Sequence, residues 1–204
     1  GHFLFLPDWE ANRLPGQLGR AADKTADYLD AVLAHVADPT AENRAAVDAA
    51  RRTATAGVRG ADESVSHARS EPGHTGMRAA TTVVNELTAI ALRLSALASL
   101  PTVRSSPIPH LDEYRQHAVA AVRHCLGPPD AIGDTAAVEA AVDGMRQYIH
   151  DLHVRREAEM RAEPEGETPL RAAVRENEPV VEELARIADT IASLTNTVAP
   201  RSMT

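Results

Sequence analysis

Apolar residues recur at intervals of three and four along most of this 204-residue chain. Before the first break, for example, an apolar or small residue stands at positions 14, 18, 22, 25, 29, 32 and 36. This spacing places side chains on one face of an α-helix, whereas a half-buried strand would need strict alternation of apolar and polar residues. No segment of useful length alternates in that way. The sequence therefore predicts an all-α fold.

Six helices are predicted, and breaks that contain proline or glycine separate most of them. They cover residues 15–37, 41–70, 75–99, 110–126, 134–160 and 168–198. Pro179 lies inside the last helix and is expected to kink or restart it, because proline cannot donate a backbone hydrogen bond. Gly57 and Gly60, in the second helix, are expected to mark close contact with a neighbouring helix. We expect an antiparallel helical bundle of about six helices, several of them long.

Composition excludes several classes of function. The chain is 44% hydrophobic and 25% charged, which is typical of a globular protein. Its net charge of -8 argues against a nucleic-acid partner, because binding to phosphate backbones needs a basic surface. The single cysteine, Cys125, rules out an internal disulfide and is expected to be a buried apolar residue. No nucleophile with a base and no phosphate-binding loop is found, so we predict no catalytic residues, no cofactor and no enzyme activity.

The large aromatic residues are concentrated at the start of the chain. Phe3, Phe5 and Trp9 lie in the first nine residues, and no Phe or Trp follows. A tryptophan just after an apolar stretch is typical of the interface between a membrane and water. We therefore predict that residues 1–10 are a membrane-exit stub and that residues 11–204 form a water-soluble helical bundle domain, with a candidate sub-boundary near 101–109. The alternative is that Phe3 and Phe5 form a hydrophobic strap over the bundle.

Histidines offer two patterns that could bind a metal. His110, His117 and His124 repeat every seven residues, which is about 10 Å along a helix. Ligands of one metal lie about 2 Å from it, so these histidines are interpreted as flanks of the core. His150 and His153 have the i,i+3 spacing of helical ligands, and Glu157 lies one turn further on. A metal site there would need ligands from another helix, and the alternative is a solvated polar face.

Several stretches resemble one family of membrane proteins. These are Phe5-Leu6-Pro7-Asp8-Trp9-Glu10 followed by Arg13-Leu14-Pro15, then Tyr28 to Leu33, Ala50-Arg51-Arg52, Ser70-Glu71-Pro72 and the apolar run from Leu87 to Leu100. Together they resemble the soluble cytoplasmic portion of the fusaric-acid-resistance-like proteins, the aromatic-acid exporter group of integral membrane transporters. The resemblance covers about the first hundred residues. From Pro101 onward only helical periodicity continues, and Gly57 and Gly60 depart from the family pattern.

This resemblance implies an efflux transporter whose membrane domain lies upstream of residue 1 and is the partner of this domain. It implies a location at the cytoplasmic face of the cell membrane and a scaffolding, oligomerisation or regulatory role. It also implies a small aromatic acid as substrate of the full-length protein. The Ala-rich faces of the second helix favour a homo-oligomer, and the alternative is that these faces serve packing within the bundle. Two alternatives stay open: a helical small-molecule-binding regulatory domain, and a metal-binding helical-bundle enzyme that uses His150, His153 and Glu157.

Overall fold

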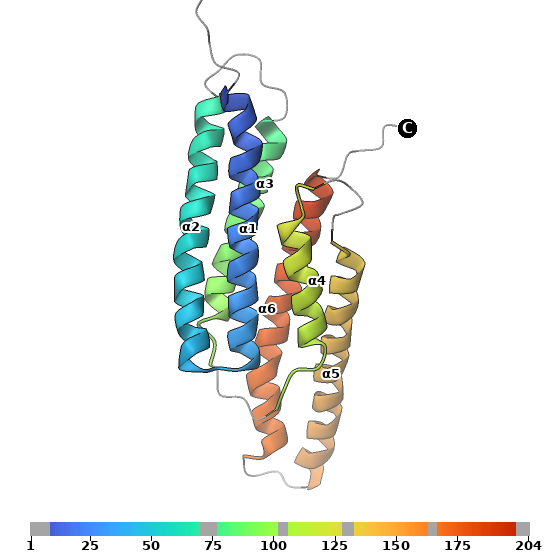
Figure 1. Ribbon diagram of the computed structural model, residues 1–204. Helices are drawn as coiled ribbons and strands as arrows, with labels where there is room; N and C mark the ends of the chain where they lie inside the picture. Colours follow the sequence, from blue (N-terminus) through green and yellow to red (C-terminus); the bar gives the residue numbers. More distant parts are fainter. Residues whose placement is uncertain (1–8, 70–76, 102–105, 128–132, 163–166, 199–204) are drawn as a thin grey trace, which may run out of the picture.

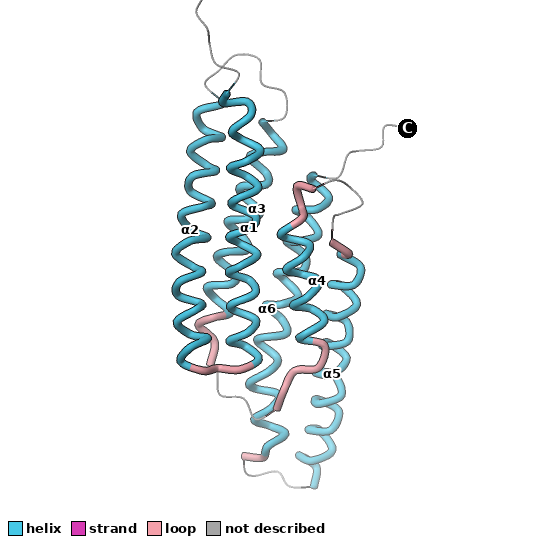
Figure 2. Tube along the Cα trace, viewed as in Figure 1, coloured by secondary structure: helices cyan, strands magenta, loops and turns pink. Residues whose placement is uncertain are grey.

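The computed structural model describes residues 9–69, 77–101, 106–127, 133–162 and 167–198. Every regular element within these ranges is an α-helix, so the predicted all-α, antiparallel bundle is confirmed (Figures 1 and 2). The helices are α1 (Trp9–Ala37), α2 (Ala41–Arg69), α3 (Met77–Leu97), α4 (Leu111–Arg123), α5 (Thr135–Ala162) and α6 (Pro169–Val198). None of them combines the length and the apolarity needed to cross a membrane.

The six helices run alternately up and down and fall into two groups of three (Figure 1). Helices α1, α3, α6 and α4 form an inner ring in which each packs against the next, and α4 packs against α1. Helix α2 lies outside this ring against α1 and α3, and α5 lies outside it against α4 and α6. One hydrophobic core therefore receives residues from all six helices.

In each group of three helices, one buried tyrosine joins the first helix to the third. The hydroxyl of Tyr28 in α1 lies 3.1 Å from Oγ of Ser95 in α3. The hydroxyl of Tyr114 in α4 donates to the carbonyl of Leu184 in α6 at 2.9 Å. Tyr28 is 1% exposed and Tyr114 is fully buried, so each ring adds a large apolar area to the core. Each also satisfies its polar group across the interface of two inner helices.

Two predictions about proline need correction. Helix α1 begins at Trp9 rather than at residue 15, and Pro15 lies inside it. Helix α6 continues from Pro169 to Val198 through Pro179, so the helix does not restart there, and a kink at Pro179 stays a prediction. Both prolines are exposed. Water can therefore bond to the backbone carbonyl that each proline leaves without its helical partner, while packing on the opposite face keeps the helix intact.

The glycine prediction is right for one position and wrong for the other. A Cβ atom on Gly57 would lie 3.5 Å from Cα of Ala21 and 3.6 Å from Cβ of Lys24, so α2 passes close to α1 there. A Cβ atom on Gly60 would meet only the side-chain oxygen of Gln17, at 4.0 Å. Gly60 therefore faces a more open space than close helix packing would leave.

Candidate functional site

A groove of about 430 Å³ runs between α2 and α3. Its volume falls within the range of about 300 to 1,000 Å³ that is usual for small-molecule sites. The apolar part of its lining consists of Val58, Val84, Ala91 and Leu92, and Tyr28 of α1 reaches it from the core. Leu92 is 67% exposed, which is unusual for a large apolar residue of this chain. The groove therefore offers apolar surface that no other part of the described structure covers.

Hydroxyl groups in this groove already donate their protons to carbonyls of their own helices. These bonds run from Thr55 to Arg51, from Thr88 to Val84 and from Ser95 to Ala91, at 2.9, 2.7 and 3.0 Å. Since the single proton of Ser95 is used, Tyr28 is the donor in its bond to Ser95. The hydroxyls can therefore accept hydrogen bonds from a ligand, but they have no proton left to donate to one.

The groups that can still donate are nitrogen groups. Arg51 lies 3.9 Å from Asp48, which is a loose ion pair. Arg59 and Asn85 make no hydrogen bond or ion pair with any residue in the described ranges. With Asp62, the charged residues of the lining carry one more positive than negative charge. The free hydrogen-bonding capacity of the groove is therefore suited to an anion.

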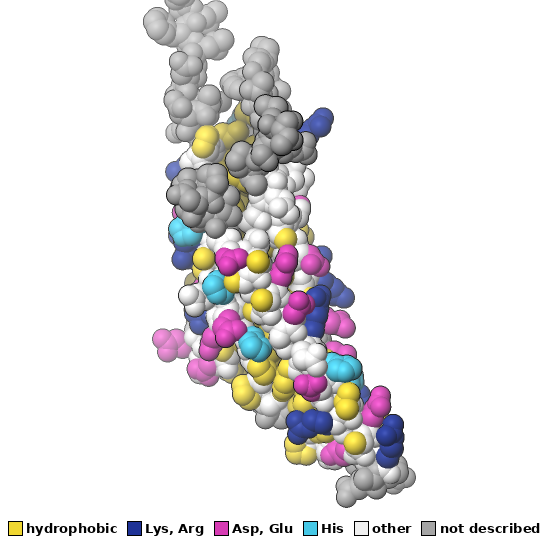
Figure 3. All heavy atoms as spheres, turned by 90° about the vertical axis from the view of Figure 1, so that its right-hand side faces the viewer, with side chains coloured by type: hydrophobic (Ala, Val, Ile, Leu, Met, Phe, Trp, Pro, Cys, Tyr) yellow, Lys and Arg dark blue, Asp and Glu magenta, His cyan; other side chains and the backbone are white. Residues whose placement is uncertain are grey.

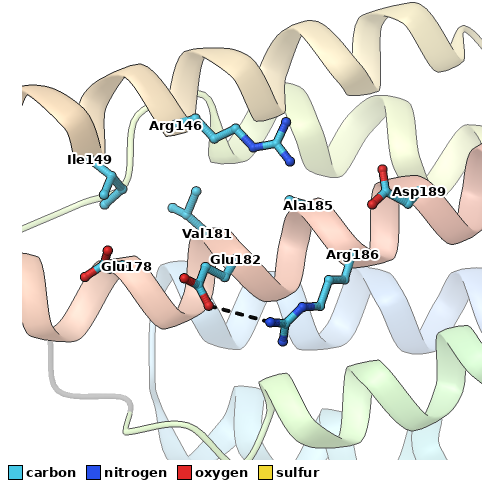
Figure 4. A pocket seen from close by; sticks show the side chains of 8 residues that line it. All are labelled: Arg146, Ile149, Glu178, Val181, Glu182, Ala185, Arg186 and Asp189. Carbon is cyan, nitrogen blue, oxygen red and sulfur yellow. Dashed lines mark ion pairs between the residues drawn. The ribbon is translucent and has the colours of Figure 1, made fainter.

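A second, smaller pocket of about 280 Å³ lies between α5 and α6 (Figure 4). Arg146 and Ile149 reach it from α5, and the rest of its lining comes from α6. Arg146 extends in the direction of Asp189, whereas Glu178 lies toward the other end of the pocket (Figure 4). Three carboxylates and two guanidinium groups line this pocket.

Most charges of this second pocket have partners of opposite sign. Arg186 lies 3.7 Å from Glu182 and 3.2 Å from Glu183. Arg146 lies 3.4 Å from Asp143 on its own helix. This pocket is therefore the weaker candidate for a ligand site, because a charged ligand would have to compete with ion pairs that already exist.

The face turned toward the viewer in Figure 3 carries acidic and basic side chains side by side rather than one patch of a single charge. The histidines on this face also lie at separate places (Figure 3). A continuous basic surface of the kind that nucleic acids require is not seen on this face.

Ion pairs tie α1 to α4 across the two groups of helices. Arg115 donates from Nε and a terminal nitrogen to the two carboxylate oxygens of Asp30, at 2.7 and 2.9 Å. Arg123 donates to Asp27 at 2.8 Å. The hydrogen bonds to Asp30 raise the pKa of the Arg115 guanidinium above its ordinary value. A two-bond contact of this kind fixes relative orientation as well as distance.

The membrane-proximal residues predicted from the sequence are mostly outside the described ranges. Phe3 and Phe5 lie outside them, and Trp9 is the first residue of α1. The membrane-exit stub therefore stays a prediction. What the structure adds is the position of the helix that follows it, because α1 is one of the four inner helices.

The metal-ligand candidates do not gather around one point. Nε2 of His153 lies 3.0 Å from an oxygen of Glu178 on α6, and Glu157 pairs with Arg161 at 3.7 Å. His150 is exposed. Across the described ranges there is no group of three or more His, Cys, Asp and Glu side chains arranged to hold a metal ion. The alternative of a metal-binding enzyme on these residues therefore gains no support from the geometry.

The three histidines spaced seven residues apart also lie in different surroundings. His110 precedes α4 with a left-handed φ of 60°, and its ring lies against Gly144 and 2.8 Å from Glu113. His117 is half-buried, and His124 is the exposed C-cap residue that follows α4. Cys125 is fully buried, and this burial raises the pKa of its thiol to about 11. A thiol with such a pKa stays protonated at neutral pH, which does not suit a nucleophile.

Sequence reasoning missed the groove between α2 and α3. The sequence features that could have indicated this groove are weak. They are the polar residues Arg59 and Asn85, which lie beside periodic apolar faces. The pairing of α2 with α3 also depends on tertiary packing that periodicity does not give.

Comparison with known protein families, with curated proteins and with solved structures finds no match to this chain. Over the residues that the structure describes, the architecture is an all-α antiparallel bundle of six helices, and this is the only class that the fold defines. The α2–α3 groove and the α1–α4 ion pairs are the features from which its function has to be argued.

Proposed function

We propose that this chain is the cytoplasmic helical domain of an integral membrane exporter of the fusaric-acid-resistance-like kind. Its role there is to hold and orient the first helix after the membrane and so to support or regulate the membrane part, without catalysing a reaction. The resemblance in residues 5–15, 28–33 and 50–52 supports this proposal. The single observation that carries the role is the place of α1, which directly follows the predicted exit segment and lies in the inner ring.

The geometry of α1 explains how such a role would work. A helix of 29 residues is about 43 Å long and behaves as a stiff rod when it is packed. Helix α1 packs against α2, α3 and α4, and the pairs Asp30–Arg115 and Asp27–Arg123 fix it to α4. A displacement of a membrane segment attached to α1 would therefore be shared with both groups of helices rather than absorbed by a loose linker.

A second candidate function is a regulatory domain that binds a small molecule. The α2–α3 groove favours this function, because Tyr28 of α1 is part of its lining and is hydrogen-bonded to Ser95 of α3. The two functions are compatible, since a ligand in the groove would touch the same helix that follows the exit segment.

The reading frame upstream of residue 1 in the natural gene tests the proposal. We expect it to encode transmembrane helices, the last of them ending within residues 3–9. A reading frame that begins close to residue 1, or one whose upstream part encodes no apolar segment long enough to span a bilayer, would contradict the proposal.

A further inference from the structure

We propose that the groove between α2 and α3 binds a small single-tailed organic anion, such as a medium-chain alkyl carboxylate. The inference stands independently of the membrane location proposed above, because it rests only on the lining of the groove. Three observations lead to it: the length of the groove, the sign of its unused polar groups, and the apolar surface between them.

The groove follows α2 and α3 along their axes. Its lining covers positions 51–62 of α2 and positions 84–95 of α3, two antiparallel segments of equal length. Eleven helical steps extend about 16 Å along each axis. A space that extends along two adjacent helices is better filled by an extended chain than by a compact ring system.

The unused donors determine the sign of the ligand. Arg59 and Asn85 have hydrogen-bond donors without partners in the described structure, and the hydroxyls of Thr55, Thr88 and Ser95 have none to give. Arginine binds carboxylates with a planar pair of donors, so Arg59 is the residue to which we assign the head group. Asp62 reduces the positive charge of the lining to a single unit. A singly charged carboxylate therefore fits the groove better than a phosphate dianion.

The middle of the groove provides the apolar contact. Val58, Ala91 and the exposed Leu92 lie between the polar ends of the lining. Covering Leu92 with an alkyl chain would remove apolar surface from water, which favours binding. Because the groove is open, the binding is expected to be weak and readily reversible.

Octanoate is the probe that tests this proposal, with the folded 204-residue chain labelled for NMR titration. We expect saturable shifts of backbone amides in α2 and α3. Octanol, octyltrimethylammonium and benzoate serve as ligands that lack the charge, reverse it, or lack the extended chain. All three are expected to bind more weakly than octanoate. Octanoate that causes no saturable shift, or any of the three control ligands binding as tightly as octanoate, would overturn the proposal.

Two variants locate the head group. Arg59→Gln is expected to weaken octanoate binding about fivefold, the most that an exposed ion pair usually contributes. Arg146→Gln removes an exposed arginine from the α5–α6 pocket and is the matched control, for which no change is expected. Equal affinity of Arg59→Gln and wild type, or an equal loss in Arg146→Gln, would overturn the assignment. Both residues are exposed, so neither substitution is expected to unfold the protein. The amide spectrum of each variant checks that it is folded.

Discussion

Raising the pH from 8 to 11 is expected to destabilise the bundle through the thiol of Cys125. This side chain is fully buried just after α4, and burial raises its pKa from 9.0 to about 11. The folded state therefore keeps the thiol proton in a range where the unfolded state loses it. The thiol has the higher pKa in the folded state. Its contribution to the free energy of unfolding is therefore complete below pH 9 and is lost as the pH rises through the folded pKa.

The size of the loss follows from the two pKa values. For pKa values of 9.0 and about 11, the free energy of unfolding falls by roughly 1 kcal/mol at pH 10 and roughly 2 kcal/mol at pH 11. Few other groups titrate in this range, since the chain has one lysine, Lys24, and three tyrosines. Burial also raises the pKa of Tyr114, so its phenol adds a further loss above pH 10.

Urea unfolding followed by circular dichroism across this pH range measures the effect. Between pH 8 and 11, Cys125→Ala is expected to lose less stability than wild type, and the difference should equal the thiol contribution given above. The cost of the substitution at neutral pH does not affect this comparison. Tyr114→Phe serves as a second variant, which should keep the loss between pH 9 and 10 and reduce only the loss above pH 10. If Cys125→Ala and wild type lose stability in parallel up to pH 11, the reasoning about burial of this thiol is refuted.

Two further predictions concern glycines with opposite surroundings. Gly57→Ala and Gly60→Ala are each expected to raise the free energy of unfolding by up to about 1 kcal/mol. Alanine favours the helix more than glycine does, and the added Cβ would meet no atom closer than 3.5 Å. Urea midpoints below that of wild type would contradict this prediction. Gly133→Ala is expected to lower the free energy of unfolding by about 2 to 3 kcal/mol, because its Cβ would lie 2.5 Å from the backbone nitrogen of Ala121. A Gly133→Ala protein as stable as wild type would show that the backbone at Gly133 can move away from α4.

The number and the order of the helices could be predicted from the sequence because local chemistry determines them. Apolar spacing identifies each helix, and residues such as Pro39, Pro101 and Gly127 mark the ends of several. The prediction failed where tertiary packing overrides a local signal. Pro15 and Pro179 lie within continuous helices, since their solvent-facing positions let water take the place of the missing backbone bond.

The features from which a function is proposed could not be predicted in the same way. Arg115 and Asp30 are 85 positions apart, and nothing in either local sequence indicates that they meet. Likewise, Arg59 and Asn85 are ordinary polar residues of two separate helices until packing places them in one groove. Periodicity shows which face of a helix is apolar, but not which neighbouring helix covers that face.

The orientation of the natural full-length protein in the cell membrane tests the central claim most directly. A tag placed after residue 204 can be probed with a protease in intact spheroplasts and after their lysis, together with alkaline carbonate extraction of the membranes. The proposed function predicts that the protein stays in the extracted membranes and that the tag is cleaved only after lysis. Release into the carbonate supernatant, or cleavage of the tag in intact spheroplasts, would contradict a cytoplasmic domain of a membrane exporter.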